Sequence, residues 1–205
     1  MDQDLVTQFK NKYETLAGIV HLVDTEDQAA EAVLDIVRLE QCRQVALGSL
    51  PASLSARIDA ACSEAGIAVV KPPYQRQQLP QAMHESPVGV TWAALAVAET
   101  GALLELTTDD ALRLVSALPR VHVGICRARD LLATHREAAA PIRRFFSQNK
   151  RNATATFISG PSRTGDIEMR LTLGVHGPEV AHAVVLGRCP DEADTGDKGD
   201  RHDAP

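Results

Sequence analysis

The chain has 205 residues and a formal net charge of −6; 44% of its residues are hydrophobic and 23% are charged. This length and composition predict a compact α/β domain and exclude a wholly disordered chain. Only 3% of the residues are aromatic. That scarcity argues against the aromatic platforms on which single-stranded bases stack, and it leaves no evident stacking cage for a flavin.

The negative charge is unevenly distributed. Residues 188–205 hold 3 basic and 6 acidic residues, a net charge of −3, and the preceding residues hold 18 basic and 21 acidic residues, also −3. We therefore expect a domain over residues 1–187, followed by a disordered acidic tail over 188–205. The nearly balanced body shows no basic footprint for nucleic acid.

The compartment and the metal chemistry are inferred from what the sequence lacks. It shows no basic and apolar leader and no apolar run of the roughly 20 residues that span a bilayer. The cysteines, Cys42, Cys62, Cys126 and Cys189, are 20, 64 and 63 residues apart, without the close pair typical of zinc or iron–sulfur sites. We expect a cytoplasmic protein with reduced thiols and no metal site.

The first half of the chain reads as a helical segment followed by a β-α-β unit. An apolar stripe predicts a helix over 2–16, and the pair Thr25 and Gln28 resembles a capping box for a helix that ends near residue 41. A strand at 45–47, a helix that Ser53 could cap and Gly66 could end, and a strand at 67–70 follow. This order favours parallel pairing of the strands.

The second half alternates in the same way. After a short helix at 76–85 and an apolar segment at 88–90, an Ala-rich stretch leads to a turn at 99–101. The sequence then predicts helices over 109–117 and 129–148, the latter kinked or split at Pro141. His122 alternates within a strand and is expected in the core or an interface. The expected strands lie at 102–106, 121–125, 154–158, 171–175 and 181–186.

Three features could carry chemistry. Residues 159–168 (SGPSRTGDIE) follow a predicted strand directly, and small residues with Arg163 suit a bound phosphate or carboxylate. His176, before a Gly-Pro turn, could orient a ligand or move a proton. Glu99 ends the Ala-rich stretch and could act as a nucleophile. Each feature has a structural alternative: a capped turn, a satisfied histidine and a carboxylate that accepts backbone N–H bonds.

These motifs together resemble the LUD (lactate utilisation) domain family, and within it the lactate utilisation protein C group, over residues 10–187. The resemblance rests on residues 89–91 (GVT), 98–101 (AETG), 118–123 (LPRVHV), 162–168 (SRTGDIE) and 173–178 (LGVHGP). The candidate catalytic residues are Glu99 and His176. The candidate ligand-binding residues are Thr91, Thr100, Gly101, Ser162, Arg163, Thr164, Asp166, Glu168 and Gly177.

The resemblance implies a layered α/β fold like that of the NagB/RpiA/CoA-transferase group, with a mainly parallel sheet and an N-terminal helical segment. It also implies an accessory role in oxidising L-lactate to pyruvate. The chain would have no redox cofactor of its own, and its partners would be an iron–sulfur subunit with a LUD domain and a cysteine-rich subunit. Where the family often has a Gly-Asn pair, this chain has Thr108, Asp109 and Asp110.

Two further functions remain open on the sequence. The chain could be an autonomous enzyme or binding protein for an anionic small molecule, such as a CoA ester, a sugar phosphate or a carboxylate, as Arg163 within its small-residue loop suggests. It could also be a regulatory or scaffold module with a vestigial pocket, which the departure at Thr108, Asp109 and Asp110 suggests.

Overall fold

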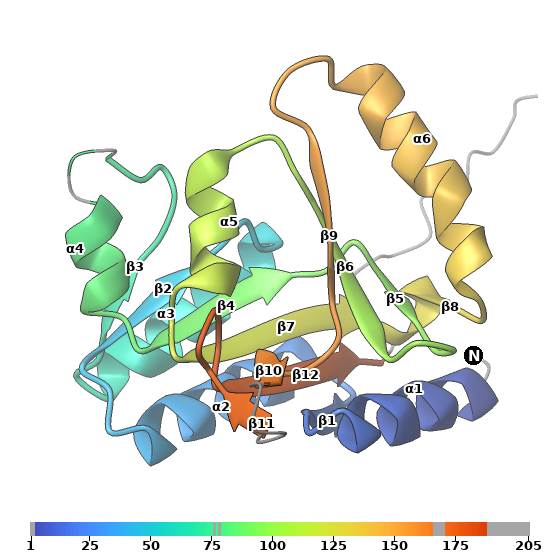
Figure 1. Ribbon diagram of the computed structural model, residues 1–205. Coiled ribbons are helices and arrows are strands. Elements are labelled where there is room, and N and C mark those ends of the chain that lie inside the picture. The colour runs from blue at the N-terminus through green and yellow to red at the C-terminus, as the bar shows by residue number, and fades with distance from the viewer. Residues whose placement is uncertain (1–2, 76, 78, 166–170, 188–205) are drawn as a thin grey trace, which may run out of the picture.

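The computed structural model describes residues 3–75, 77, 79–165 and 171–187 (Figure 1). The predicted acidic tail over 188–205 lies outside the described residues. The described α-helices are α1 (Gln3–Thr15), α2 (Glu26–Leu39), α3 (Ala52–Glu64), α4 (Leu79–His84), α5 (Asp110–Ala117) and α6 (Ala139–Gln148). None of them is long and apolar enough to cross a bilayer.

A parallel sheet forms the centre of the domain, in the strand order β1-β12-β7-β4-β2-β3. Every neighbouring pair in it is parallel, because helices or long connections return the chain to the starting edge between strands. The expected α/β fold with a mainly parallel sheet and N-terminal helices is confirmed. The strands of this sheet are β1 (Ile19–Val23), β2 (Gln44–Leu47), β3 (Ala68–Val70), β4 (Val88–Trp92), β7 (Val121–Arg127) and β12 (Val180–Leu186).

A smaller mixed sheet, which the sequence did not predict, lies on one face of the parallel sheet. Its order is β8-β5-β6-β9; β6 is antiparallel to β5 and β9, and β5 is parallel to β8. The Ala-rich stretch supplies β5, in which Ala96 is fully buried in the core that the two sheets share. The strands of this mixed sheet are β5 (Leu95–Val97), β6 (Ala102–Thr107), β8 (Leu131–Leu132) and β9 (Thr154–Ile158).

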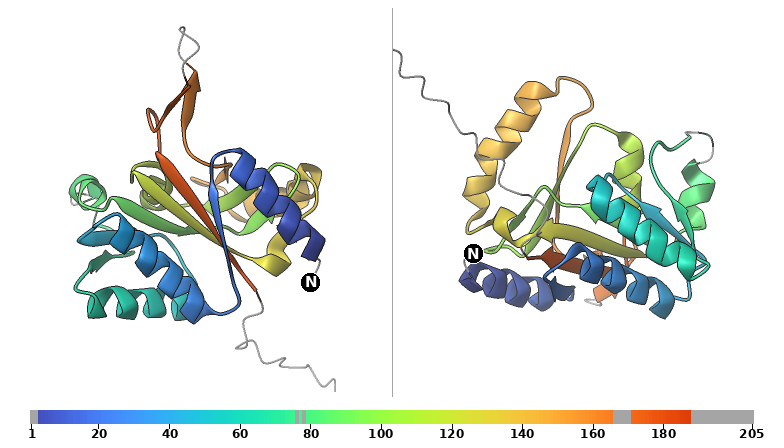
Figure 2. Two further views of the ribbon diagram at one scale, coloured as in Figure 1. Left: turned by 90° about the horizontal axis from the view of Figure 1, so that it is seen from below. Right: turned by 180° about the vertical axis from the view of Figure 1, so that it is seen from behind.

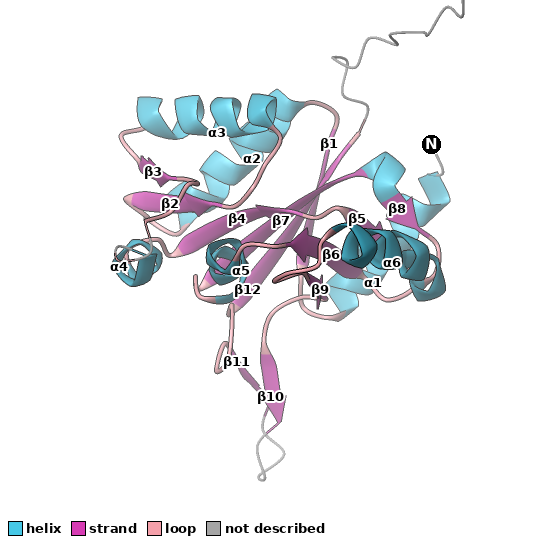
Figure 3. Ribbon diagram, turned by 90° about the horizontal axis from the view of Figure 1, so that it is seen from above, coloured by secondary structure: helices cyan, strands magenta, loops and turns pink. Residues whose placement is uncertain are grey.

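Successive side chains along each parallel strand point to opposite faces of the sheet, so the core is divided between the two faces. In β7, Val121, Val123 and Ile125 pack with α2 and α3, whereas Cys126 packs on the opposite face, with α1 and the mixed sheet. Helices α4 and α5 cover that opposite face toward β2. Figure 3 shows α2 and α3 on one side of the parallel sheet and α4 and α5 on the other.

A short antiparallel hairpin, β10 (Arg163–Gly165) and β11 (Leu171–Leu173), projects from the body next to β12 (Figure 2). The strand predicted at 171–175 therefore ends earlier than expected. Gly174 adopts φ +76 directly after β11, a conformation that favours glycine and turns the chain away from the strand.

Two local predictions are wrong. Residues 129–138 do not form part of an α-helix: the 3-10 helix η1 (Ala128–Asp130), strand β8 and the 3-10 helix η2 (His135–Ala138) precede α6. Pro141 lies in the first turn of α6, where the proline's missing N–H costs no helical hydrogen bond. The side chain of Ser53 does not cap α3, because its hydroxyl donates to Glu26 Oε1 at 2.9 Å.

Candidate functional site

The two small-residue segments singled out in the sequence meet at one cavity. The backbone N–H of Ser162 donates to Pro178 O at 2.8 Å, and that of Gly174 donates to Ser162 O at 2.9 Å. The cavity beside them has a volume of about 360 Å³. Its lining comes from the C-terminal end of α5, the start of β7, the strand β9 and both segments: Ser116, Ala117, His122, Thr156, Phe157, Ile158, Ser159, Gly160, Pro161, Ser162, His176, Gly177 and Pro178.

The cavity lies at the amino ends of the neighbouring parallel strands, not at their carboxyl ends. Ligands of open α/β sheets usually bind at the carboxyl ends of parallel strands. Here β9 belongs to the mixed sheet, and His122 and Pro178 lie at the amino ends of β7 and β12. The segment that begins at Ser159 does follow a strand directly, as predicted; that strand is β9 of the mixed sheet, and the segment borders the cavity.

A buried polar network of Thr91, Glu105 and His122 forms behind the cavity. Thr91 lies at the end of β4, His122 in β7 and Glu105 in β6, with 4%, 0% and 7% of their surfaces exposed. The Thr91 hydroxyl donates to Glu105 Oε1 and lies 2.8 Å from Nε2 of His122. Nε2 of His122 also lies 3.5 Å from Glu105 Oε1. The network thus joins the two sheets through polar groups inside an otherwise apolar interface.

The environment keeps Glu105 ionised. Burial alone would raise the pKa of Glu105, because it penalises the charged form. Hydrogen bonding and charge from His122, together with the hydroxyls of Thr91 and Ser116, outweigh that effect and hold the pKa of Glu105 below its ordinary value. A buried carboxylate of this kind is stable only while its partners stay in place.

The predicted site residues fall into separate places. Ser162, His176 and Gly177 line the cavity together, whereas Thr91 belongs to the buried network and lines a second cavity, of about 160 Å³, with Glu105. Arg163 and Thr164 belong to β10, which leaves the cavity edge and continues into the hairpin. Asp166 and Glu168 lie outside the described residues.

The segment with Glu99, Thr100 and Gly101 does not line this cavity. It forms the turn between β5 and β6, where the exposed carboxylate of Glu99 accepts the backbone N–H of His135 at 2.9 Å. Gly101 has φ +58, and a Cβ there would meet the backbone of α1 at Tyr13. The turn thus anchors η2 and α1; the predicted chemical roles of its residues stay predictions.

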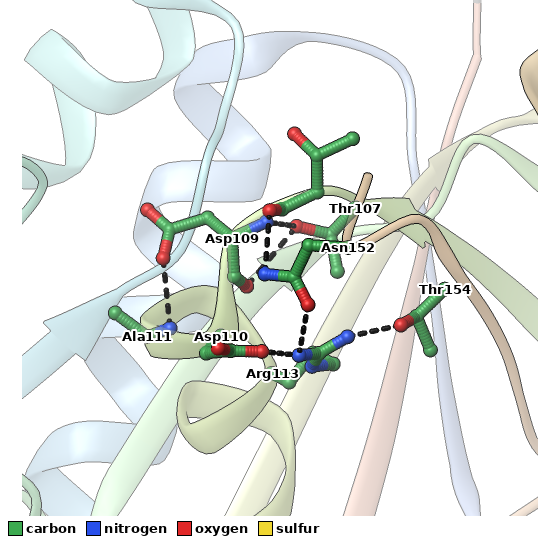
Figure 4. Close-up of polar contacts among 8 residues, drawn as sticks. Thr107, Asp109, Asp110, Ala111, Arg113, Asn152 and Thr154 are labelled. Carbon is green, nitrogen blue, oxygen red and sulfur yellow. Dashed lines mark hydrogen bonds and ion pairs between the residues drawn. The ribbon is translucent and has the colours of Figure 1, made fainter. Parts of the chain in front are cut away.

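Thr108, Asp109 and Asp110, where the family often has a Gly-Asn pair, lie at the start of α5 and make contacts that stabilise it (Figure 4). The Asp109 carboxylate accepts the N–H of Ala111 at 2.8 Å and so caps α5. Arg113 pairs with Asp110 and donates to Asn152 Oδ1 at 3.1 Å and to the Thr154 hydroxyl. These contacts tie the start of α5 to the loop that enters β9, which is a wall of the cavity.

The sequence reasoning missed Glu105 and Ser116 as members of the site. The sequence did contain a signal for Glu105. It lies two residues after Leu103 in the same strand, so it faces the same buried side, and a buried carboxylate must find a partner inside the protein. His122 was expected in the core, and it is fully buried. Its contact with Glu105 depends on the mixed sheet, which the sequence did not predict. No cluster of three or more potential metal-binding side chains occurs in the described part of the chain.

Comparison with known proteins agrees with the family resemblance found in the sequence. Residues 6–186 match the model of a family described as the LUD domain. A protein of Shouchella clausii named Lactate utilization protein C is 37% identical over 99 residues, which are 48% of this chain and 43% of that protein. A protein of the same name from Bacillus subtilis is 33% identical over 104 residues, which are 48% of this chain and 42% of that protein. The matched segments thus span less than half the length of these relatives.

One solved structure shares the fold. The crystal structure of a DUF162 family protein from Deinococcus radiodurans superimposes with a TM-score of 0.60 at 20% sequence identity. The superposition covers 90% of this chain and 97% of that chain. At this identity the likeness concerns the fold alone.

Proposed function

The chain belongs to the LUD domain family, and from this membership we propose that it serves lactate utilisation as an accessory component of an L-lactate-oxidising assembly. The observation that carries the proposal is the family match over residues 6–186, together with relatives named Lactate utilization protein C. Because those relatives are matched over less than half of their length, the role in the pathway is itself part of the proposal.

We further propose that the redox cofactors of this assembly, iron–sulfur clusters, reside on an iron–sulfur subunit with a LUD domain and a cysteine-rich subunit. The chemistry of the described cysteines supports this division. Cys42, Cys62 and Cys126 are buried free thiols. Burial raises the pKa of Cys62 to about 11 and of Cys126 to about 12, so both resist forming the thiolate that binds metals. Reduced thiols also suit the cytoplasm, where we place the assembly.

A second candidate function is the binding or conversion of an anionic small molecule by the chain on its own. The cavity lined by Ser162, His122 and His176 favours it, since converging polar groups in a concave site are typical of ligand binding. The two functions differ in whether the chain acts within an assembly or on its own, and this difference can be measured.

The test is to tag the full chain at its own chromosomal locus and to isolate it from cells grown on L-lactate. We expect the isolated material to contain iron–sulfur proteins and to oxidise L-lactate with an added electron acceptor. The same tagged chain purified alone from a heterologous host should do neither. Lactate oxidation by the chain alone, or recovery without any iron–sulfur protein, would contradict the accessory role.

A further inference from the structure

Helix α6 has an apolar side that the rest of the domain leaves largely uncovered. None of its residues is buried, and none belongs to a hydrophobic cluster of the described core. Ile142 and Phe145 are half-buried, whereas Phe146 has 42% of its surface exposed. Figure 1 shows α6 at the outer edge of the domain, beyond the mixed sheet. Two of the chain's four phenylalanines therefore stand on a helix that contributes no residue to the core.

The exposed aromatic side chain is held in place. The ring of Phe146 meets that of Phe145 edge to face, with ring centroids 5.9 Å apart and an interplanar angle of 82°. Asn149 ends the helix, because its backbone N–H and its side-chain amide donate to Phe145 O at 3.0 and 2.9 Å. A side chain that is ordered before binding loses less conformational entropy when a partner covers it. Phe146 is thus preorganised for a contact outside the domain.

Charge is segregated around this helix. Residues 138–165 contain no carboxylate and five basic residues, in a chain whose net charge is −6. Arg143, Arg144, Lys150 and Arg151 make no ion pair within the part of the chain that the structure describes. A locally basic surface attracts an acidic one and repels a basic one, so these charges favour a partner with carboxylates on its surface.

The spacing on the helix brings the apolar and the charged group together. Arg143 and Phe146 are three residues apart, so they are neighbours on one side of α6. Aromatic residues and arginine are the residue types enriched in protein–protein interfaces. A bilayer surface suits this helix less well, because membrane-bound helices bury a whole apolar face, and Phe146 is the one large apolar side chain that α6 exposes.

We propose that the side of α6 with Arg143 and Phe146 is a docking surface for another protein, whose complementary surface is acidic and has an apolar pocket for Phe146. Arg143 pairs with a carboxylate of that partner. The identification of the partner as an iron–sulfur subunit of the assembly rests on the proposed function, whereas the chemistry of the docking surface comes from α6 itself.

The test is photocrosslinking in cells grown on L-lactate, with p-benzoylphenylalanine in place of Ser147, an exposed residue directly after Phe146. We expect an adduct with an iron–sulfur subunit, and we expect Arg143→Glu to reduce its yield at least about tenfold. The same probe in place of the exposed Leu39 on α2 should give no adduct that depends on Arg143. No adduct at position 147, or one that Arg143→Glu leaves unchanged, overturns the proposal.

Rebinding of the released subunits separates the two parts of the surface. Iron–sulfur subunits are eluted from the wild-type chain at about 1 M salt, which screens charges beyond about 3 Å, and are returned to about 0.15 M salt. Immobilised Phe146→Ser and Arg143→Glu should each retain at most about a tenth of what the wild type retains. Leu39→Ser and Arg43→Glu, the same changes at exposed positions outside α6, should retain as much as the wild type.

Loss of the fold is a separate outcome in this design. All four positions lie outside the buried core, so each variant should unfold at the urea concentration that unfolds the wild type. Equal retention of the subunits by Arg143→Glu and Arg43→Glu would contradict the docking surface. Sedimentation of the wild-type chain with phosphatidylglycerol vesicles, abolished by Arg143→Glu, would replace the protein partner with an anionic membrane.

This test and the test of the pathway role can fail independently. An Arg143-dependent adduct with a protein that has no iron–sulfur cluster would retain the docking surface and remove the accessory role. Isolation of the L-lactate-oxidising assembly in wild-type yield from Arg143→Glu would retain the accessory role and remove α6 from its interface.

Discussion

At the scale of single residues, the fold tolerates a buried carboxylate because three partners surround it. Glu105 has His122, Thr91 and Ser116 within reach, and their combined effect keeps the pKa of Glu105 below its ordinary value. Removing one partner of a buried charged network typically costs about 3–5 kcal/mol, because the remaining charge is left uncompensated. We therefore expect few other side chains to be tolerated at the positions of Glu105 and its partners.

A pair of histidines, one buried and one half-buried, makes stability depend on pH. Nε2 of His21 lies 2.9 Å from Nδ1 of His182 across the β1–β12 pairing. Burial, with the charges of His21 and His122, lowers the pKa of His182 to about 4. The unfolded chain therefore takes up a proton near pH 6.5 that the folded chain refuses until about pH 4, so folding free energy is lost as the pH falls through this window.

We expect this loss to reach about 3 kcal/mol for His182 between pH 7 and pH 4. Urea unfolding at several pH values measures it, and His182→Gln should show a flatter decline than the wild type. His84→Gln, which changes an exposed histidine on α4, should decline like the wild type. Parallel pH profiles of His182→Gln and the wild type would show that His182 does not cause the dependence.

At the scale of secondary-structure elements, α5 determines the shape of the cavity. Its C-terminal end supplies Ser116 and Ala117 to the lining, while Asp109 caps its start and Arg113 ties it to the loop before β9. The helix lies so close to β4 that a Cβ on Gly89 would overlap the carbonyl oxygen of Val115. A backbone atom cannot rotate away as a side chain can, so the helix itself would have to move.

Gly89→Ala should therefore destabilise the chain by about 3 kcal/mol, at the upper end of typical overpacking costs. Thermal or urea unfolding provides the measurement. Gly66→Ala is the matched control, because Gly66 has φ +72 but open space around its missing Cβ, so only backbone strain of about 1 kcal/mol is expected. A cost for Gly89→Ala no greater than that for Gly66→Ala would refute the close approach of α5 to β4.

At the scale of the whole molecule, local patterns predicted elements better than they predicted the layers. The apolar stripe of α1 and the capping pair Thr25 and Gln28 are local signals, and the Thr25 hydroxyl does accept the N–H of Gln28 at 3.2 Å. The mixed sheet has weaker signals. Its strands β5 and β8 are only a few residues long, and β8 depends on pairing with a distant segment. Such pairings are decided by tertiary packing, which propensity does not record.

The same limit applies to the candidate site. The small-residue segments around Ser162 and His176 could be recognised because Gly, Pro and Ser mark turns in any context. The network of Thr91, Glu105 and His122 could not, because it joins strands of two different sheets. Glu99 drew attention through its place after an apolar stretch, yet the structure places it in a turn that accepts a backbone N–H of η2.

The most direct measurement of the central claim, that the chain serves lactate utilisation, is growth of a strain from which its gene has been deleted. We predict that the deletion strain fails to grow on L-lactate as sole carbon source, grows normally on pyruvate, and regains growth on L-lactate when the full chain is expressed again. Growth of the deletion strain on L-lactate at the rate of its parent would contradict the claim.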